Sequence, residues 1–234
     1  MPPSPDYVPQ RVLICTPHPD DAEIGAGGTL AKWIRKGAQV TLVVCTNGDK
    51  GSEDPEMTSQ RLAAIREKEQ LDAASVLGLK EVVFLRHPDG EIEDNRQFRG
   101  EVVREIRRAK PDVVLTTDPW RRTNYQHRDH RVTGQVVLDA VFPLARDHLN
   151  FQEHKKMGLS PHKTPYVFLW GSDAPDFHSD IESTLEAKVA ALAKHASQVS
   201  ARDTAKFLRE NAARIGKDKG LKAAEAFRVI EFRV

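Results

Sequence analysis

Short apolar runs that alternate with helical stretches constrain the fold of this chain more than any other feature of its sequence. Five such runs are predicted strands, at residues 11–16, 39–46, 81–85, 112–117 and 166–170. Continuously apolar runs of this length are typical of strands that are buried on both faces. Because strands alternate with helices through the first two-thirds of the chain, the pattern predicts an α/β fold of three layers, with helices on both faces of a mostly parallel sheet.

The segments between and after these runs complete the expected architecture. Helices are predicted at 59–77, 98–109 and 132–145, further helices extend to about residue 215, and a last strand covers 227–234. Residues 146–165 are polar and without a period, and the proline-rich residues 1–10 are expected to be flexible. One domain over residues 1–234 is the simplest organisation for a chain of this length.

The composition argues against several classes of partner. Lys and Arg total 35 against 34 for Asp and Glu, so the chain lacks the basic excess that phosphate binding usually needs, and we expect no nucleic acid partner. No stretch approaches the roughly 20 apolar residues of a membrane span, and residues 1–10 lack the apolar core of a signal peptide. These features predict no membrane partner and a cytoplasmic location. Cys15 and Cys45 lie inside apolar runs and are expected to be buried free thiols.

A first polar motif directly follows the first predicted strand, in the stretch TPHPDDAEIGAGGTL. His18, Asp20 and Asp21 lie within four positions, and Pro17 and Pro19 stiffen the backbone between them. An imidazole nitrogen and a carboxylate oxygen are ordinary zinc ligands. We therefore expect His18 and Asp21 to face one point, with Asp20 available for a different task.

Two alternatives compete for this motif. An aspartate before a helix can cap its free N–H groups, although this explains one aspartate and leaves His18 unexplained. The glycines that follow could form a dinucleotide-binding loop, but a G-x-G-x-x-G pattern that starts at Gly25 meets Leu30 where it needs glycine. We interpret Gly27 and Gly28 as glycines that permit tight packing at the start of the helix.

A second polar motif follows the fourth predicted strand and contains His127, Asp129 and His130. In parallel sheets, ligands bind beyond the carboxyl ends of the strands, so the two motifs are expected to meet there. Catalytic zinc uses three protein ligands and one open position for water. Two residues of the first motif and one histidine of the second supply three ligands. Asp20 could then accept the proton of the water, and the other histidine could stabilise or protonate what forms.

The two motifs together resemble those of the PIG-L/LmbE-type de-N-acetylases. The matching stretches are HPDDAEIGAGGTLA at 18–31 and HRDHRVTG at 127–134. Weaker matches are TNGD at 46–49, REKEQLDAASVLGL at 66–79, HPDGEI at 87–92, KVAALAKHASQ at 188–198 and AEAF at 224–227. The resemblance implies a Rossmann-like fold and a mononuclear hydrolase that uses Zn²⁺, or another divalent metal, to remove an N-acetyl group from a small N-acetylglucosamine-type substrate.

The resemblance also implies roles for eight residues by their position in the motifs. His18, Asp21 and His130 would be zinc ligands, Asp20 the general base, His127 a group that stabilises the transition state, Asp129 the residue that orients His127, and Arg66 and Asp89 substrate contacts. Arg66 could instead form a surface salt bridge on its helix. Turn chemistry alone could explain Asp89, which lies in a Pro-Asp-Gly sequence. We interpret His195 as structural or as a group behind the site.

Other functional hypotheses remain open at this level. The same chemistry could act on another bond, in a zinc amidase that cleaves a larger sugar or thiol conjugate. A binding protein could hold metal and sugar without turnover, and the sheet alone could suggest a nucleotide-binding protein. The resemblance further implies a homo-oligomer, a trimer or a hexamer. We expect the irregular segment 146–165 to lie near the site, where it would influence the choice of substrate.

Overall fold

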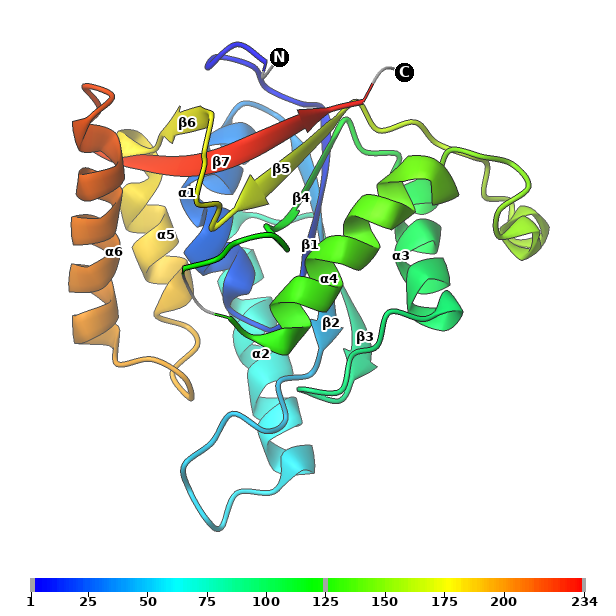
Figure 1. The fold of residues 1–234 in the computed structure, drawn as a ribbon. Coiled ribbons are helices and arrows are strands. Elements are labelled where there is room, and N and C mark those ends of the chain that lie inside the picture. The colour runs from blue at the N-terminus through cyan, green and yellow to red at the C-terminus, as the bar shows by residue number, and fades with distance from the viewer. Residues whose placement is uncertain (1–2, 124–125, 233–234) are drawn as a thin grey trace.

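A seven-stranded sheet forms the centre of the molecule in the computed structural model, which describes residues 3–123 and 126–232 (Figure 1). Its strands are β1 (Arg11–Thr16), β2 (Gln39–Thr46), β3 (Glu81–His87), β4 (Val113–Thr117), β5 (Tyr166–Trp170), β6 (Phe177–Asp180) and β7 (Ala224–Glu231). They lie in the order β3-β2-β1-β4-β5-β7-β6. The first five strands in this order are parallel, and β7 runs antiparallel to both β5 and β6.

Helices cover both faces of this sheet. They are α1 (Asp21–Arg35), α2 (Ser59–Leu77), α3 (Arg96–Ala109), α4 (Arg128–Asp139), α5 (Leu185–Leu192) and α6 (Ala201–Lys217), with the short turns η1 (Ala140–Leu144), η2 (Gln152–Met157) and η3 (Glu182–Thr184). Helices α1, α2 and α5 pack together, and α3 packs with α4 and η1 (Figure 1). One apolar core contains Val43, Phe98 and Val136, and a second contains Leu30 and Trp33. The predicted three-layer α/β fold with a mostly parallel sheet is confirmed.

The differences from the predicted elements have local causes. Helix α4 begins at Arg128, earlier than expected, because the ring of His127 accepts a hydrogen bond from the Asp129 N–H at the helix start. The short strand β6 was not predicted, since its sequence FHSD has only one large apolar residue. The last strand begins at Ala224, and residues 233–234 lie outside the described residues.

The glycines of α1 allow neighbouring elements to approach its backbone. A Cβ atom on Gly28 would lie 2.8 Å from Ile181 Cδ1, and one on Gly27 would lie 3.2 Å from Lys188 Cγ. The predicted role of these two glycines in tight packing is confirmed. Cys15 and Cys45 are buried free thiols, as expected.

A buried ion pair between Lys188 on α5 and Glu225 on β7 contacts the middle of α1. Lys188 Nζ lies 2.6 Å from Glu225 Oε1, and both side chains are 4% exposed. The Glu225 carboxylate also accepts hydrogen bonds from the backbone N–H groups of Gly28 and Thr29, at 2.9 and 2.8 Å. Lys188 donates a second hydrogen bond to the Ile24 carbonyl. One carboxylate therefore neutralises an ammonium group and satisfies two backbone donors away from water.

The irregular segment 146–165 packs against α3 and continues to the amino end of the sheet. The buried guanidinium of Arg107 donates to five carbonyl oxygens, those of Leu144, Ala145, Asp147, Asn150 and Phe151. His162 Nε2 lies 2.8 Å from the carbonyl of Pro111, just before β4 begins. The segment ends where β5 begins, at the end of the sheet that holds the amino ends of the parallel strands. This placement differs from the expected one near the site.

The N-terminal residues also make more contacts than expected for a flexible segment. The ring of Tyr7 packs on Tyr166 with centroids 5.6 Å apart, and the Gln10 N–H donates to Asp112. Residues 1–2 lie outside the described residues. Among the helices of residues 3–123 and 126–232, none is long and apolar enough to cross a membrane.

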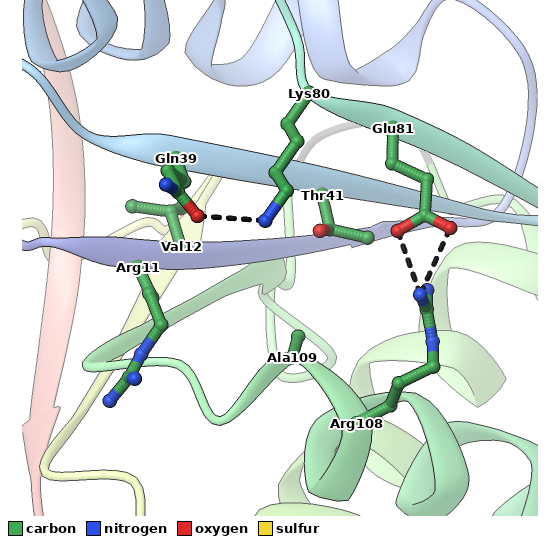
Figure 2. A pocket seen from close by; sticks show the side chains of 8 residues that line it. All are labelled: Arg11, Val12, Gln39, Thr41, Lys80, Glu81, Arg108 and Ala109. Carbon is green, nitrogen blue, oxygen red and sulfur yellow. Dashed lines mark hydrogen bonds and ion pairs between the residues drawn. The ribbon is translucent and has the colours of Figure 1, made fainter.

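A small cavity of about 100 Å³ lies at the amino ends of β1, β2 and β3 (Figure 2). Polar side chains that line it bind one another. Lys80 Nζ donates to Gln39 Oε1 at 2.8 Å, and Arg108 Nη1 binds both carboxylate oxygens of Glu81 at 2.8 and 2.9 Å. Because these groups already satisfy one another, this cavity is a poor candidate for a ligand site.

Candidate active site

The topology places the two polar motifs at one crevice. After β1 the chain builds β2 and β3 on one side, and it then returns to add β4 on the other side of β1. Such a switch point opens a crevice outside the carboxyl ends of the two central strands. The loop after β1 carries His18 and the loop after β4 carries His127, so the sequence motifs meet as predicted.

Three buried side chains form a first cluster in this crevice. His18 Nδ1 lies 3.3 Å from Asp21 Oδ2, and His130 Nε2 lies 3.4 Å from Asp21 Oδ1. The backbone N–H of His18 also donates to the Asp21 carboxylate at 2.9 Å. One ligand atom from each of the three residues lies within 4.8 Å of the others. These are the three residues that the family resemblance implies as zinc ligands.

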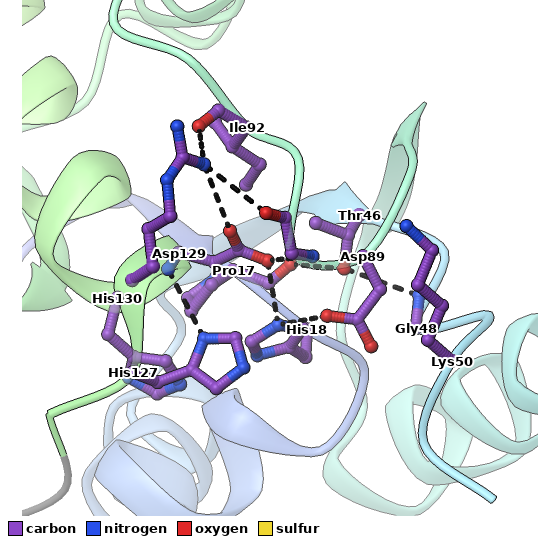
Figure 3. A network of polar contacts seen from close by, with 12 residues as sticks. Pro17, His18, Thr46, Gly48, Lys50, Asp89, Ile92, His127, Asp129 and His130 are labelled. Carbon is purple, nitrogen blue, oxygen red and sulfur yellow. Dashed lines mark hydrogen bonds and ion pairs between the residues drawn. The ribbon is translucent and has the colours of Figure 1, made fainter.

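A second cluster shares His18 with the first (Figure 3). His18 Nε2 lies 3.0 Å from Asp89 Oδ1 and 3.2 Å from Asp129 Oδ2. The ring of His127 stands edge-on to the ring of His18, with centroids 4.7 Å apart and an interplanar angle of 85°. One imidazole is therefore surrounded by the carboxylates of Asp21, Asp89 and Asp129.

The protonation preferences of these groups suit a divalent cation. Burial lowers the pKa of His18, but its hydrogen bonds with Asp129, Asp21 and Asp89 raise that pKa to about 12 overall. Without a metal, the His18 proton is thus the positive charge that balances the carboxylates. Burial lowers the pKa of His130 to about 4, which leaves a neutral ring with a nitrogen lone pair. Burial opposes ionisation of Asp21, but His130 and His18 lower its pKa well below the usual range.

Two imidazoles and one ionised carboxylate, buried and close together, are therefore a donor set that fits zinc. The carboxylate of Asp129 supports the same conclusion. It is fully buried, and its Oδ1 atom accepts no hydrogen bond among the described residues, with Arg128 Nη1 3.8 Å away. Negative charge thus gathers here where water cannot neutralise it.

Asp20 lies beside the first cluster in a strained backbone conformation. Its φ of 94° is left-handed, and residues with a Cβ atom rarely adopt this conformation. Asp20 occupies the N-cap position of α1, but its side chain makes no capping hydrogen bond, so the capping alternative does not hold. Its Oδ2 atom lies 3.3 Å from Arg66 Nη2. Burial and the neighbouring Asp21 raise the pKa of Asp20 to about 7.

Arg66 is buried, so the surface salt-bridge alternative is wrong. Its guanidinium donates to the carbonyls of Gly48 and Pro19, at 3.0 and 2.8 Å, besides its contact with Asp20. The side chain therefore joins the loops that follow β1 and β2 and holds the Asp20 carboxylate. A substrate contact of Arg66 remains a prediction.

Asp89 has partners beyond those of a simple turn. Its carboxylate faces His18, and its N–H donates to Asp49 Oδ1 at 2.9 Å. The side chain lies in the crevice with the catalytic candidates (Figure 3). Its predicted contact with substrate remains a prediction.

The contact between Asp129 and His127 differs in kind from the expected one. The Asp129 N–H donates to His127 Nδ1 at 3.2 Å, while the Asp129 carboxylate accepts from the Gly90 N–H at 2.7 Å and faces His18. Because His127 Nδ1 accepts this hydrogen bond, Nε2 is the ring nitrogen that can donate one. Asp129 thus orients His127 through its backbone.

Two residues behind the site were not predicted from sequence. Arg121 Nη2 lies 3.0 Å from His130 Nδ1. Gln70, fully buried on α2, accepts a hydrogen bond from the Asp20 N–H at 3.1 Å. The four-residue spacing from Arg66 to Gln70 could have indicated that both lie on one face of α2, toward the loop that carries Asp20.

The fold and this cluster together define an α/β protein with a candidate metal site for hydrolysis. The family model described as "PIG-L: GlcNAc-PI de-N-acetylase" matches residues 13–141. The chain belongs to this family of de-N-acetylases, which are amide hydrolases.

Individual relatives extend the match over almost the whole chain. The diacetylchitobiose deacetylase of Thermococcus kodakarensis is 34% identical over 226 residues, which cover 94% of this chain and 83% of the relative. A 1D-myo-inositol 2-acetamido-2-deoxy-alpha-D-glucopyranoside deacetylase of Mycobacterium sp. strain KMS is 29% identical, with coverages of 81% and 74%. The solved structure of N,N'-diacetylchitobiose deacetylase from Pyrococcus horikoshii, bound to an inhibitor, matches with a TM-score of 0.90 and 32% identity, over 95% of this chain and 84% of that one.

Proposed function

We propose that this chain is a zinc-dependent hydrolase that removes an N-acetyl group from a small N-acetylglucosamine-type sugar. The convergence of His18, Asp21 and His130 beside Asp20 and His127 is the observation that carries the proposal. The relatives support the substrate class, because one is named a diacetylchitobiose deacetylase and another a deacetylase of a 2-acetamido-2-deoxy-alpha-D-glucopyranoside.

His18, Asp21 and His130 would hold the metal ion in this proposal. A bound zinc ion, or another divalent ion, would supply Lewis-acid activation of water and of the amide carbonyl. The chain supplies the proton transfers and the orientation of the reacting groups.

Asp20 accepts the proton of the attacking water. Arg66 holds its carboxylate, and a pKa of about 7 lets it take a proton near neutral pH and release it again. A base whose pKa lies near the working pH serves both directions of transfer. Asp20 can therefore also return the proton to the leaving amine.

His127 stabilises the charge that develops on the carbonyl oxygen. Its Nδ1 accepts the Asp129 N–H, so the Nε2–H is the group that donates to the carbonyl oxygen in this proposal. A donor fixed in advance costs no reorganisation at the moment of reaction. The products are acetate and a free amino sugar.

The test is acetate release from N,N'-diacetylchitobiose and from N-acetylglucosamine, with metal-stripped protein before and after addition of zinc. We expect release only with metal, and manganese and cobalt can be compared in the same assay. Stoichiometric zinc without acetate from either sugar would refute simple sugar deacetylation. Larger sugar and thiol conjugates, the substrates of the amidase alternative, would then be assayed for amine release.

Assembly and location stay predictions. A trimer or hexamer is expected, and light scattering coupled to size-exclusion chromatography measures it directly. A cytoplasmic location is expected and is tested by fractionation of the source cells.

A further inference from the structure

A buried amide on α2 reaches the backbone of the proposed base. Gln70 is fully buried, and its Oε1 atom accepts the Asp20 N–H at 3.1 Å. Its Nε2 atom donates to Glu23 Oε1 at 2.9 Å. The side chain therefore bridges the loop after β1 and the first turn of α1, on the side of Asp20 away from the crevice.

The partners of Gln70 fix the direction of its amide. A backbone N–H only donates hydrogen bonds, so the Gln70 oxygen must face Asp20 and its NH₂ faces Glu23. Glu23 is itself fully buried, and its second oxygen lies 3.4 Å from Nε2 of the fully buried His195. The amide thus has one orientation, set by a carboxylate that is held in turn by α1 and the loop after α5.

The backbone of Asp20 needs such support. A left-handed conformation of a residue with a Cβ atom persists only where the surroundings impose it. The Gln70 oxygen holds the N–H of Asp20, and Arg66 holds its carboxylate. Without the first contact, the residue can relax toward an ordinary φ, and its carboxylate then turns away from the metal-binding cluster.

We propose that Gln70 is a positioning residue that holds Asp20 in its reactive conformation, and that Glu23 fixes the Gln70 amide for this purpose. The inference rests on the proposed function of Asp20 as the base. It assigns Gln70 no contact with substrate or metal.

The test is the kinetics of Gln70→Met with zinc-loaded protein and N,N'-diacetylchitobiose. We expect kcat to fall about 10- to 100-fold, because a misplacement of about 1 Å at a reacting group can cost this much. The KM should stay within about twofold, and zinc per chain should be unchanged. The matched control is Gln135→Met, which removes an amide that hydrogen-bonds Asp139 on α4 and should leave all three quantities unchanged.

An exchange of the two partners keeps the inference testable if Gln70→Met does not fold. Gln70→Glu alone sets two carboxylates against each other and should lower kcat. In the double variant Gln70→Glu with Glu23→Gln, residue 23 donates and residue 70 still offers an oxygen to the Asp20 N–H. This double variant should recover most of kcat; a double variant as slow as Gln70→Glu overturns the inference.

Asp20→Asn separates this inference from the proposed function. If Gln70 acts through Asp20, then Gln70→Met should change the residual rate of Asp20→Asn by less than about twofold. If Gln70→Met lowers the rate of the Asp20→Asn variant as much as it lowers the rate of the wild type, the inference is overturned. If Asp20→Asn is inactive while Gln70→Met has normal kcat, the inference fails and the function stands. If Asp20→Asn keeps full activity, the proposed role of Asp20 as the base is wrong, and the inference about Gln70, which rests on it, is wrong as well.

Discussion

The buried pair of Lys188 and Glu225 yields a stability prediction with a calculable size. In Glu225→Gln the ammonium of Lys188, only 4% exposed, loses its counter-charge while the side-chain shape is kept. Removing one partner of a buried pair costs about 3–5 kcal/mol, because the other charge stays buried and uncompensated. For a chain of this size, 1 kcal/mol shifts Tm by about 2–4 °C, so a Tm lower by about 10 °C is expected.

The complementary change, Lys188→Met, should cost less. The Glu225 carboxylate keeps the two N–H donors of Gly28 and Thr29, so a loss of about 2 kcal/mol is expected. The double variant should be more stable than the sum of the two single losses predicts, since the two side chains share one interaction.

Thermal unfolding followed by circular dichroism, with urea unfolding at 25 °C, measures these differences. Lys222→Met is the control, because Lys222 pairs with Glu182 at the surface, with 80% and 52% of the two side chains exposed. It should leave Tm unchanged within error. The reasoning is refuted if Glu225→Gln lowers Tm no more than Lys222→Met does.

Three further predictions address the site and the scaffold. Asp20→Ala should lower kcat by about 10²–10⁴-fold with zinc still bound, and loss of zinc, measured by atomic absorption, would instead make Asp20 a ligand. Arg107→Met removes a donor from five carbonyl oxygens, three of which keep a backbone N–H, and should lower stability by about 3 kcal/mol in urea unfolding; an unchanged midpoint would contradict this. Burial opposes ionisation of Glu101, but its hydrogen bond with His87 lowers its pKa below 4.5. The ionised Glu101 carboxylate therefore stabilises the fold above about pH 4.5, and this contribution is lost as the pH falls through the lowered pKa. The difference in free energy of unfolding between wild type and Glu101→Gln should shrink from pH 7 to pH 3.5.

The sequence predicted those parts of the structure that depend on local patterns. Continuous apolar runs located β1, β2, β4 and β5 to within one residue, because strands buried on both faces leave no polar alternation. The residues that gather in the crevice were found for a related reason. His18 and Asp89 come soon after strands, His127 ends the loop that follows β4, and the carboxyl ends of parallel strands lie together at one end of the sheet.

Features that depend on distant contacts were not predictable in this way. The place of residues 146–165 depends on contacts with distant residues, such as the Arg107 guanidinium on α3 and the Pro111 carbonyl, and no period in the segment reveals them. Arg66 looks like an exposed helix residue until the loops after β1 and β2 close over it. Asp129 lies two residues after His127 in sequence, but its carboxylate faces His18, which comes more than a hundred residues earlier.

The return of the chain to β1 also determines when the candidate metal-binding cluster can form. His18 and Asp21 leave the ribosome more than a hundred residues before His130, and β4 must pair with β1 before the three meet. A nascent or truncated chain that ends before α4 therefore offers only two of the three proposed ligands and should hold metal weakly. In the metal-bound enzyme that we propose, the cation would add its binding free energy to the folding free energy, and a chelator would lower the stability of the mature chain.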